Sequence, residues 1–391
     1  MRLRLVLPRR RRRRGLGRLT RRAALCAAAV ALLLPGCGGG AKHRAAPARP
    51  IEIGITEANP HLIAPSDQPA AFAPWRDRLA ALHPSYLRVL VDWARVQPSR
   101  DAPPDLAQGA DGCLRGIPPC APYGGIRDQL RAAKAAGMEV VVTFLGTPDW
   151  AVGGRCGRGR TAVPDLAAYR TLLRSLAALG DQEGVALRWW SPWNEPNNPD
   201  FLGQCNAYPG LAAAMADTLP PGARLVLGDA AGYDRSSPRT TGAADLAAGL
   251  PGALACAPGA VWAQHVYVRV DRHLAADAQR APAGDVPLLD GVERALDSRG
   301  CAGPPAPLWI TETGADPRDG APGCVAMDAA LRRWAADGRV AAAFQYTFRD
   351  DTAFPVGLAD AGLTQLHPAY AAWLAWAAGR PAGDPCQPSG R

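Results

Sequence analysis

The chain alternates, eight times over, between a short apolar run and a longer segment with helical spacing. The apolar runs are predicted β-strands and cover residues 51–56, 86–91, 139–144, 187–193, 224–228, 261–268, 308–311 and 340–346. The predicted helices cover residues 72–82, 125–136, 166–179, 211–219, 243–250, 288–299, 324–336 and 368–378. Strands that alternate with helices form βαβ units and a parallel sheet. Eight such units predict an α/β fold, a single (β/α)8 TIM barrel over residues 51–380.

An open, doubly wound sheet is the alternative arrangement of the same units. Such a sheet usually carries a Gly-rich phosphate-binding turn after its first strand. Here the first run continues into Thr-Glu-Ala-Asn-Pro, with no Gly-x-Gly-x-x-Gly pattern. The sequence therefore favours the barrel. Within the predicted helices, Asp165 is placed as an N-cap, and Gly180, Gly300 and Gly338 stand where helices are expected to end.

The first 36 residues are typical of a bacterial export signal. They hold eleven arginines and no acidic residue, and a twelve-residue apolar run from Ala23 to Leu34 follows the basic region. That run is shorter than the about 20 residues of a membrane-spanning helix. Leu34-Pro35-Gly36-Cys37 resembles a lipobox, so we expect a signal peptide over residues 1–36 and a lipid on Cys37. An ordinary signal cut between Ala41 and Ala46 is the alternative.

The export signal accounts for the basic character of the chain. The whole sequence has 44 basic and 35 acidic residues and a net charge of +9. Without the eleven arginines of the signal, 33 basic residues face the same 35 acidic ones. The high isoelectric point therefore gives no reason to expect a nucleic-acid partner. Residues 37–50 are predicted to be a tether between a lipid-bearing terminus and the barrel, and residues 381–391 a C-terminal tail.

Eight of the ten cysteines lie outside the signal and the lipobox. An even number in an exported protein predicts up to four disulfides, whose pairing the sequence leaves open. Free buried thiols are the alternative. The chain has neither a Cys-x-x-Cys pair nor a His-Glu-x-x-His stretch, so no zinc site is expected.

Ionisable and aromatic side chains follow the apolar runs, at the strand ends where active sites of such barrels lie. They are Arg88, Asp92 and Trp93 near the second run, Trp150 after the third, Asn194 and Glu195 after the fourth, His265 and Tyr267 on the sixth, Glu312 on the seventh, and Tyr346, Phe348, Arg349 and Asp350 near the eighth. Two carboxylates at one barrel mouth suit the cleavage of a glycosidic bond, because one protonates the departing oxygen while the other attacks the anomeric carbon. We expect them about 5–5.5 Å apart, the spacing of retaining enzymes, with the pKa of one raised by the other.

The stretch W-N-E-P-N at 193–197, followed by E-T-G at 312–314, resembles the clan of retaining (β/α)8 glycoside hydrolases. That clan includes cellulase-like and xylosidase/iduronidase-like families, and the resemblance spans about residues 51–379. It implies that Glu195 is the acid/base and Glu312 the nucleophile. It also implies that Arg88 supports the nucleophile and that His265 and Tyr267 form the His-x-Tyr pair of the sixth strand. G-T-P-D-W at 146–150 is similar to a turn of some xylosidase/iduronidase-like members.

Sugar-binding roles are expected for residues around the two glutamates. Asn194 is predicted to bind a sugar hydroxyl next to the reacting carbon, and Trp150 is the candidate for stacking on a sugar ring. The third strand lacks the His of cellulase-like members. The eighth lacks the Trp that often forms the floor of the sugar site, so Tyr346 or Phe348 takes that place or the floor is missing.

The sequence thus predicts an exported O-glycoside hydrolase that acts on oligo- or polysaccharide and needs no cofactor. A carbohydrate-binding lipoprotein of the same fold without turnover is the main alternative, and turnover of aryl glycosides would separate the two. A serine hydrolase is disfavoured because no Gly-x-Ser-x-Gly stretch occurs. A metal-dependent hydrolase is disfavoured because, among the histidines, only His265 is well placed. The sequence gives no indication of the sugar, the linkage or the oligomeric state.

Overall fold

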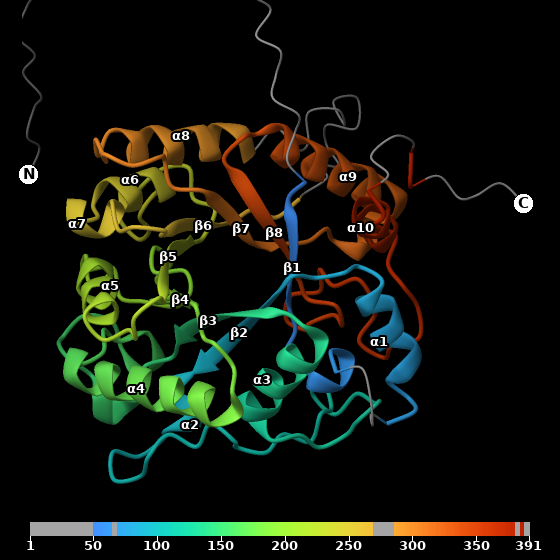
Figure 1. Cartoon of the computed structure of the whole chain (residues 1–391), viewed down its shortest axis with the longest axis horizontal. Helices are drawn as coiled ribbons and strands as arrows, with labels where there is room; N and C mark the ends of the chain where they lie inside the picture. The colour runs from blue at the N-terminus through green and yellow to red at the C-terminus, as the bar shows by residue number, and fades with distance from the viewer. Residues whose placement is uncertain (1–49, 65–68, 269–284, 380–383, 387–391) are drawn as a thin grey trace, which may run out of the picture. The chain divides into compact units, whose positions relative to one another are not determined.

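The strands form one closed parallel barrel in which each strand pairs with its neighbour in sequence and β8 pairs with β1 (Figure 1). The computed structural model describes residues 50–64, 69–268, 285–379 and 384–386. The predicted single (β/α)8 barrel is confirmed, and the doubly wound alternative is wrong. The predicted signal peptide, the lipidation site Cys37 and, apart from Pro50, the tether lie outside the described residues.

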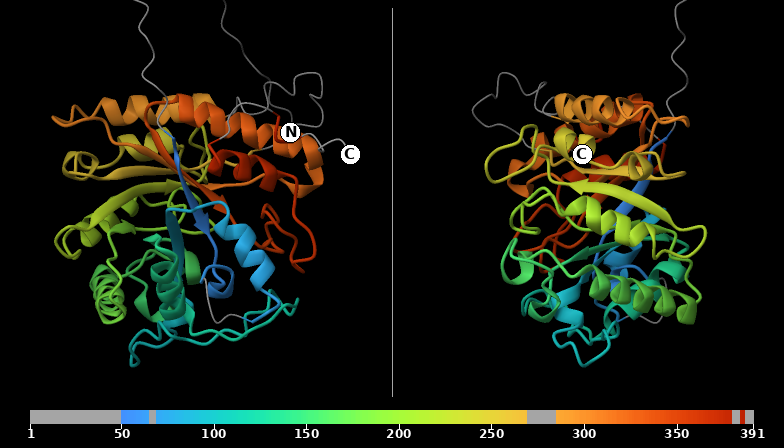
Figure 2. Two further views of the ribbon diagram at one scale, coloured as in Figure 1. Left: turned by 45° about the vertical axis from the view of Figure 1, so that its right-hand side comes forward. Right: turned by 90° about the vertical axis from the view of Figure 1, so that its left-hand side faces the viewer.

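The barrel is surrounded by helices, as the two views of Figure 2 show. The strands are β1 Glu52–Thr56, β2 Tyr86–Asp92, β3 Glu139–Leu145, β4 Trp189–Ser191, β5 Arg224–Ala230, β6 Val261–His265, β7 Leu308–Thr313 and β8 Val340–Tyr346. The α-helices are α1 Ala73–Ala80, α2 Trp93–Val96, α3 Gly125–Ala136, α4 Leu166–Glu183, α5 Tyr208–Ala216, α6 Ala243–Ala248, α7 Gly252–Ala255, α8 Asp285–Asp297, α9 Gly320–Ala336 and α10 Ala369–Ala377.

Large aromatic side chains fill the inside of the barrel. The rings of Trp189 and Trp309 lie 4.5 Å apart, and Trp309 also contacts Phe344 at 5.8 Å. Gly54 on β1 leaves the space for Phe344, because a Cβ at this glycine would lie 2.2 Å from the ring. A second, larger core lies between the strands and the helices. The interior is therefore a packed layer that supports the site at the barrel mouth.

Helix α4 shows how the helices attach to the barrel. Asp165 accepts a hydrogen bond from the Ala168 amide at 2.9 Å and caps the helix as predicted. The prediction that Gly180 ends this helix is wrong, because α4 continues to Glu183 and stops at Gly184 in the left-handed conformation. Gly180 serves close packing instead, since a Cβ there would lie 2.9 Å from Leu187.

All eight cysteines outside the predicted signal and lipobox form disulfides, which confirms the prediction of up to four and shows that the free-thiol alternative is wrong. The pairs are Cys113–Cys120, Cys156–Cys205, Cys256–Cys301 and Cys324–Cys386. The last pair fastens the tail to α9. Among the residues that the structure describes, every helix is too short or too polar to span a membrane.

Candidate active site

Glu195 and Glu312 face each other across the mouth of the barrel. Glu195 follows β4 and Glu312 lies on β7. One carboxylate oxygen of each and a ring nitrogen of His265 all lie within 4.8 Å of one another. Both glutamates line a cavity of about 390 Å³ that is also lined by Asn194, Tyr267, Tyr346 and Phe354. The structure thus brings the two predicted acids together at one site.

The backbone at Glu195 is held in an unusual conformation. Strand β4 ends at Ser191, earlier than predicted, because Pro192 has no N–H with which to continue the ladder. The Asn194 amide then donates to the Phe144 carbonyl at 2.8 Å, and the Glu195 amide donates to the Asp229 carbonyl at 2.9 Å. Glu195 has a φ of 42°, in the left-handed region that a non-glycine residue occupies at a cost. Neighbouring strands therefore fix the direction of this carboxylate.

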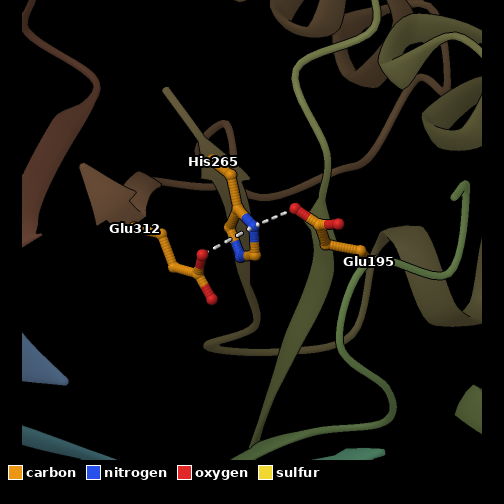
Figure 3. Close-up of side chains that lie close together, drawn as sticks. All are labelled: Glu195, His265 and Glu312. Atoms are coloured by element: carbon orange, nitrogen blue, oxygen red, sulfur yellow. Dashed lines mark hydrogen bonds and ion pairs between the residues drawn. The ribbon is translucent and has the colours of Figure 1, made fainter. Parts of the chain in front are cut away.

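His265 lies between the two carboxylates (Figure 3). Its Nδ1 is 2.9 Å from a Glu195 oxygen and 3.4 Å from a Glu312 oxygen, and its Nε2 is 3.0 Å from Asp229. Burial by itself would lower the pKa of His265, but the charge of Glu312 and the contacts with Asp229 and Glu195 raise it to about 10. At neutral pH the ring is therefore a cation that donates from both nitrogens.

The electrostatics of Glu195 differ from the expectation. Burial acts to raise its pKa, but the hydrogen bond and charge of His265, together with a hydrogen bond from Asn198 at 2.7 Å, lower it. The expected raised pKa from carboxylate repulsion is wrong for Glu195, because a cation stands between the two acids. The proton of this pair therefore resides on His265, 2.9 Å from the Glu195 carboxylate.

Glu312 is held by Arg88, as the resemblance implies, and by Tyr267. Arg88 on β2 donates from Nη1 to one oxygen at 2.7 Å, and the Tyr267 hydroxyl donates to the other at 2.5 Å. Burial and the charge of Glu312 raise the pKa of Tyr267 well above its usual range, so the phenol keeps its proton. Both oxygens of Glu312 therefore accept hydrogen bonds, and the carboxylate has a fixed orientation.

Asp229 is the most buried charged residue of the site among those that the sequence prediction missed. It lies on β5, is fully buried, and accepts from Arg88 at 2.9 Å and from His265 at 3.0 Å. Burial opposes its charge, but the charge of Arg88 and the contacts with His265 hold its pKa far below the usual range. Hydroxyl groups of three further strands donate to the same carboxylate, at 2.6–3.0 Å, from Thr143, Ser191 and Thr311. The predicted fifth strand ended two residues too early, at Gly228 rather than Ala230, so the prediction gave Asp229 no role.

Asn194 and Asn198 complete the surroundings of Glu195. The Asn194 carbonyl oxygen accepts from Arg88 Nη2 at 2.7 Å. Its side-chain nitrogen Nδ2, unlike its backbone N–H, has no partner among the described residues, and the side chain lines the cavity. This arrangement leaves a donor available next to the two acids. Asn198 was not singled out in the sequence, although it lies in the same turn as Glu195.

The aromatic residues are divided between the cavity and the core. Tyr346 lines the cavity, whereas Phe348 is fully buried against Tyr370. Phe354, in the loop after β8, also lines the cavity, is 39% exposed and contacts the Tyr267 ring edge-on at 4.8 Å. Trp150 lies on a short 3-10 turn outside the set of residues that line this cavity, and its indole N–H donates to the Gln97 carbonyl. A sugar would have to extend beyond the cavity to reach Trp150.

The triad of Glu195, His265 and Glu312 has the composition of a possible metal site. A metal would need a neutral imidazole nitrogen. Both nitrogens of His265 instead contact carboxylates, Nδ1 on Glu195 at 2.9 Å and Nε2 on Asp229 at 3.0 Å. The donor set therefore fits a proton-carrying triad better than a metal centre.

No protein-family model matches the chain, and no curated protein sequence matches it either. Several solved structures share its fold. A family 39 glycoside hydrolase from Bacteroides cellulosilyticus WH2 superposes with a TM-score of 0.53 at 16% identity, over 84% of this chain and 64% of that one. A family 51 α-L-arabinofuranosidase from Bifidobacterium longum gives 0.54 at 16% identity, over 85% and 72%.

An endo-β-1,4-glucanase from Xanthomonas axonopodis pv. citri also gives a TM-score of 0.54 at 16% identity, and the match covers 85% of this chain and all of that one. The chain thus spans less than two thirds of the family 39 relative but the full length of the glucanase. At such identities the likeness establishes the fold. The chain has the closed eight-stranded barrel that these glycoside hydrolases share.

Proposed function

We propose that the protein is a retaining O-glycoside hydrolase that acts on oligo- or polysaccharide, with Glu312 as nucleophile and Glu195 as acid/base. The observation that carries this proposal is the approach of the two carboxylates within 4.8 Å across one cavity. Retaining enzymes place their carboxyl groups about 5–5.5 Å apart, whereas inverting enzymes need about 6.5–9.5 Å to admit a water. The fold shared with known glycoside hydrolases supports the same conclusion.

In the first step, Glu312 attacks the anomeric carbon and the bond from that carbon to the leaving oxygen breaks. Glu195 gives its proton to the leaving oxygen, and a glycosyl ester forms on Glu312. In the second step, a water molecule gives a proton to Glu195, and the water oxygen bonds to the anomeric carbon. The ester bond between that carbon and Glu312 breaks, which releases the Glu312 carboxylate. Two inversions at one carbon leave the configuration unchanged.

The proton for the first step comes from the pair formed by Glu195 and His265. The two groups hold one proton between them at neutral pH, and the 2.9 Å contact allows it to move from Nδ1 to the carboxylate. A sugar that enters the cavity displaces water, and this raises the free energy of the form in which His265 is positive and Glu195 is negative. Substrate binding therefore favours the form in which Glu195 carries the proton.

Arg88, Tyr267 and Asn194 have supporting roles in this proposal. Arg88 and Tyr267 fix the direction of Glu312 for in-line attack. The free amide nitrogen of Asn194 is placed to donate to the sugar hydroxyl next to the reacting carbon, where a contact strengthens in the transition state. Tyr346 and Phe354 offer aromatic surfaces to the sugar.

The test begins with a panel of aryl glycosides and Glu312→Gly. We expect wild-type turnover of at least one glycoside, and loss of turnover in the variant by about 10⁴-fold or more, because no nucleophile remains. Azide should partly restore the variant and give a glycosyl azide of inverted configuration. The panel includes arabinofuranosides and glucosides, because the neighbours named above are an arabinofuranosidase and a glucanase, and xylosides, because the sequence resembles xylosidase-like families.

Three other outcomes have distinct meanings. We expect azide to rescue Glu195→Gly and to give a glycosyl azide of retained configuration. If Glu312→Gly gives the retained glycosyl azide instead, the roles of the two glutamates are exchanged. Full activity of both variants would refute the assignment. Sugar binding without turnover by the wild-type protein would support the carbohydrate-binding alternative.

A further inference from the structure

A second cavity adjoins the catalytic one on the side of β1, β2 and β8. Its volume is about 600 Å³, and it shares Leu90, Tyr346 and Asp351 with the catalytic cavity. Arg88 also lines it, whereas Glu195 does not. Pockets that enclose small ligands have volumes of about 300–1,000 Å³. A ligand seated on Glu312 can therefore continue from the first cavity into the second.

The position of Glu195 decides which part of the substrate enters the second cavity. The acid must reach the leaving oxygen, so the leaving portion lies toward Glu195 and β4. The portion that becomes bonded to Glu312 extends the other way, toward β1, β2 and β8. In a glycan chain this portion is the non-reducing end.

The outer wall of the second cavity is a loop with its own crosslink. We call residues 109–123 the stapled loop, because the disulfide Cys113–Cys120 joins its two arms and an isolated antiparallel bridge pairs Ala110 with Tyr123. Seven consecutive residues of this loop, 109–115, line the cavity, as does Tyr123. The strand-end residues of β1 and β8 form the opposite side.

Polar contacts fasten the stapled loop to the barrel. Arg349, just after β8, donates to the Ile117 carbonyl at 2.8 Å and to the Pro119 carbonyl at 3.2 Å. Arg115 and Asp351 form an ion pair at 3.9 Å between the loop and the segment after β8. On the other side, the Asn59 amide donates to the Gly112 carbonyl at 3.3 Å. The loop is therefore a fixed wall.

The charges that line the second cavity balance. Four arginines and four acidic residues line it. Arg88 is paired with Asp229 and Glu312, Arg115 with Asp351, and Asp350 with His367. A cavity of this kind offers hydrogen bonds without a net charge, which suits the hydroxyl groups of neutral sugars.

We propose that the second cavity holds the non-reducing end of a neutral glycan and that the stapled loop limits its length, so that hydrolysis releases short products of one size from chain ends. This inference rests on the proposed function and adds its mode of action. An open groove would let a chain pass and allow internal cleavage. A wall at this position stops the chain a fixed number of sugar units beyond Glu312.

The experiment uses hexasaccharides labelled at the reducing end, starting with β-1,4-linked glucose and xylose chains and continuing with the glycan that the aryl-glycoside panel identifies. Labelled products are separated while little substrate has been consumed. We expect wild-type protein to give one dominant labelled product. Cleavage at random internal bonds would give a ladder of labelled products and would overturn the inference.

A loop deletion tests the wall directly. The Cα atoms of Cys113 and Cys120 are 4.3 Å apart, close to the about 3.8 Å between consecutive residues. Residues 114–119 can therefore be removed, with Cys113→Gly and Cys120→Gly, and the chain rejoined with little strain. We expect the fraction of internal cleavage to rise several-fold in this variant, and an unchanged distribution would refute the inference.

Cys256→Ser/Cys301→Ser is the matched control, because it removes a disulfide that joins segments preceding β6 and β7, away from both cavities. Its product distribution should equal that of the wild type.

As a second loop variant, Arg115→Ala should shift the distribution in the same direction as the deletion, even if the deletion folds poorly. If no glycoside is cleaved at all, the proposed function fails and this inference fails with it. If glycosides are cleaved at random positions, only this inference fails.

Discussion

His265 ties the charge state of the site to the stability of the fold. The ring is 1% exposed and contacts Glu195, Glu312 and Asp229. Its pKa is about 10 in the folded chain, whereas an unfolded His has a pKa of about 6.5. A group whose pKa is raised on folding stabilises the fold below its unfolded pKa, and this contribution is lost as pH rises through the folded value.

We therefore expect the free energy of unfolding to fall as pH rises from about 6.5 to about 10. His265→Gln removes the titrating group, so the free energy of unfolding of this variant should change less with pH in this window than that of the wild type. The difference between the two proteins should be largest near pH 6 and smallest near pH 10. Urea denaturation at a series of pH values measures this, and parallel curves would contradict the assignment of the pKa to His265.

Asp229 should be the most sensitive acidic residue outside the two catalytic candidates. Asp229→Asn keeps the shape of the side chain but leaves Arg88 and His265 without their buried counter-charge. Removal of one partner of a buried ion pair costs about 3–5 kcal/mol of unfolding free energy. Activity should fall as well if the proposed function is right, since Arg88 contacts Glu312 and His265 contacts both Glu195 and Glu312.

The matched control for this change is Asp217→Asn. Asp217 pairs with Arg170 at 3.6 Å, but its side chain is 70% exposed. Exposed pairs contribute about 0–1 kcal/mol. Equal losses of stability in the two variants, measured by urea denaturation, would show that Asp229 is not a structural centre of the site.

The loop after β8 adds an aromatic side chain to the cavity that holds Glu195 and Glu312. Phe354 lies there, 39% exposed, with ring contacts to Tyr267 at 4.8 Å and Tyr346 at 6.1 Å. Phe354→Ala should raise KM for glycosides by about threefold to tenfold, in line with the about 0.5–1.5 kcal/mol of an aromatic contact. Leu374→Ala, on α10 and similarly exposed at 38%, is the control and should leave KM unchanged. An unchanged KM in Phe354→Ala would remove this residue from the sugar site.

Strand positions were predictable from the sequence because apolar runs and helical spacing are local signals. All eight strands form where they were predicted, and α3 has the predicted bounds, Gly125–Ala136. The ends of strands were less predictable. Strand β4 stops at Ser191 because of Pro192, while β5 continues through Asp229 to Ala230. These one- or two-residue differences decide which side chains enter the site.

The site was predictable where a residue lies in a recognisable motif. Glu195, Glu312, Arg88, His265 and Tyr267 meet at one place, as the resemblance implied. Asp229 and Phe354 have no such local signal, because their roles arise from contacts with residues far away in the sequence. Trp150 shows the opposite case. It lies in a recognisable motif and was predicted to stack on a sugar ring, but it does not line the cavity and its indole N–H donates to the Gln97 carbonyl.

The four disulfides divide into three that close long segments and one that closes a short one. The sequence separations are 45, 49 and 62 residues for the long ones and 7 for Cys113–Cys120. The chain-entropy model predicts larger stabilisation for longer closed segments. Cys324→Ser/Cys386→Ser should therefore lower the free energy of unfolding by about 4 kcal/mol, and Cys113→Ser/Cys120→Ser by about 2 kcal/mol. Urea denaturation of both pairs measures the order, and a reversed order would contradict the model for this chain.

The pairing of β1 with β8 sets a condition on how the molecule matures. Glu52–Thr56 hydrogen-bonds with residues 342–346, so the ring stays open until nearly nine tenths of the chain has been made. A nascent polypeptide that stops earlier presents two unpaired strand edges, which are templates for aggregation. Such a chain already carries Arg88, Glu195 and Glu312 but has no closed frame to hold them. The frame that brings these three side chains together is therefore complete only when the last strand has paired with the first.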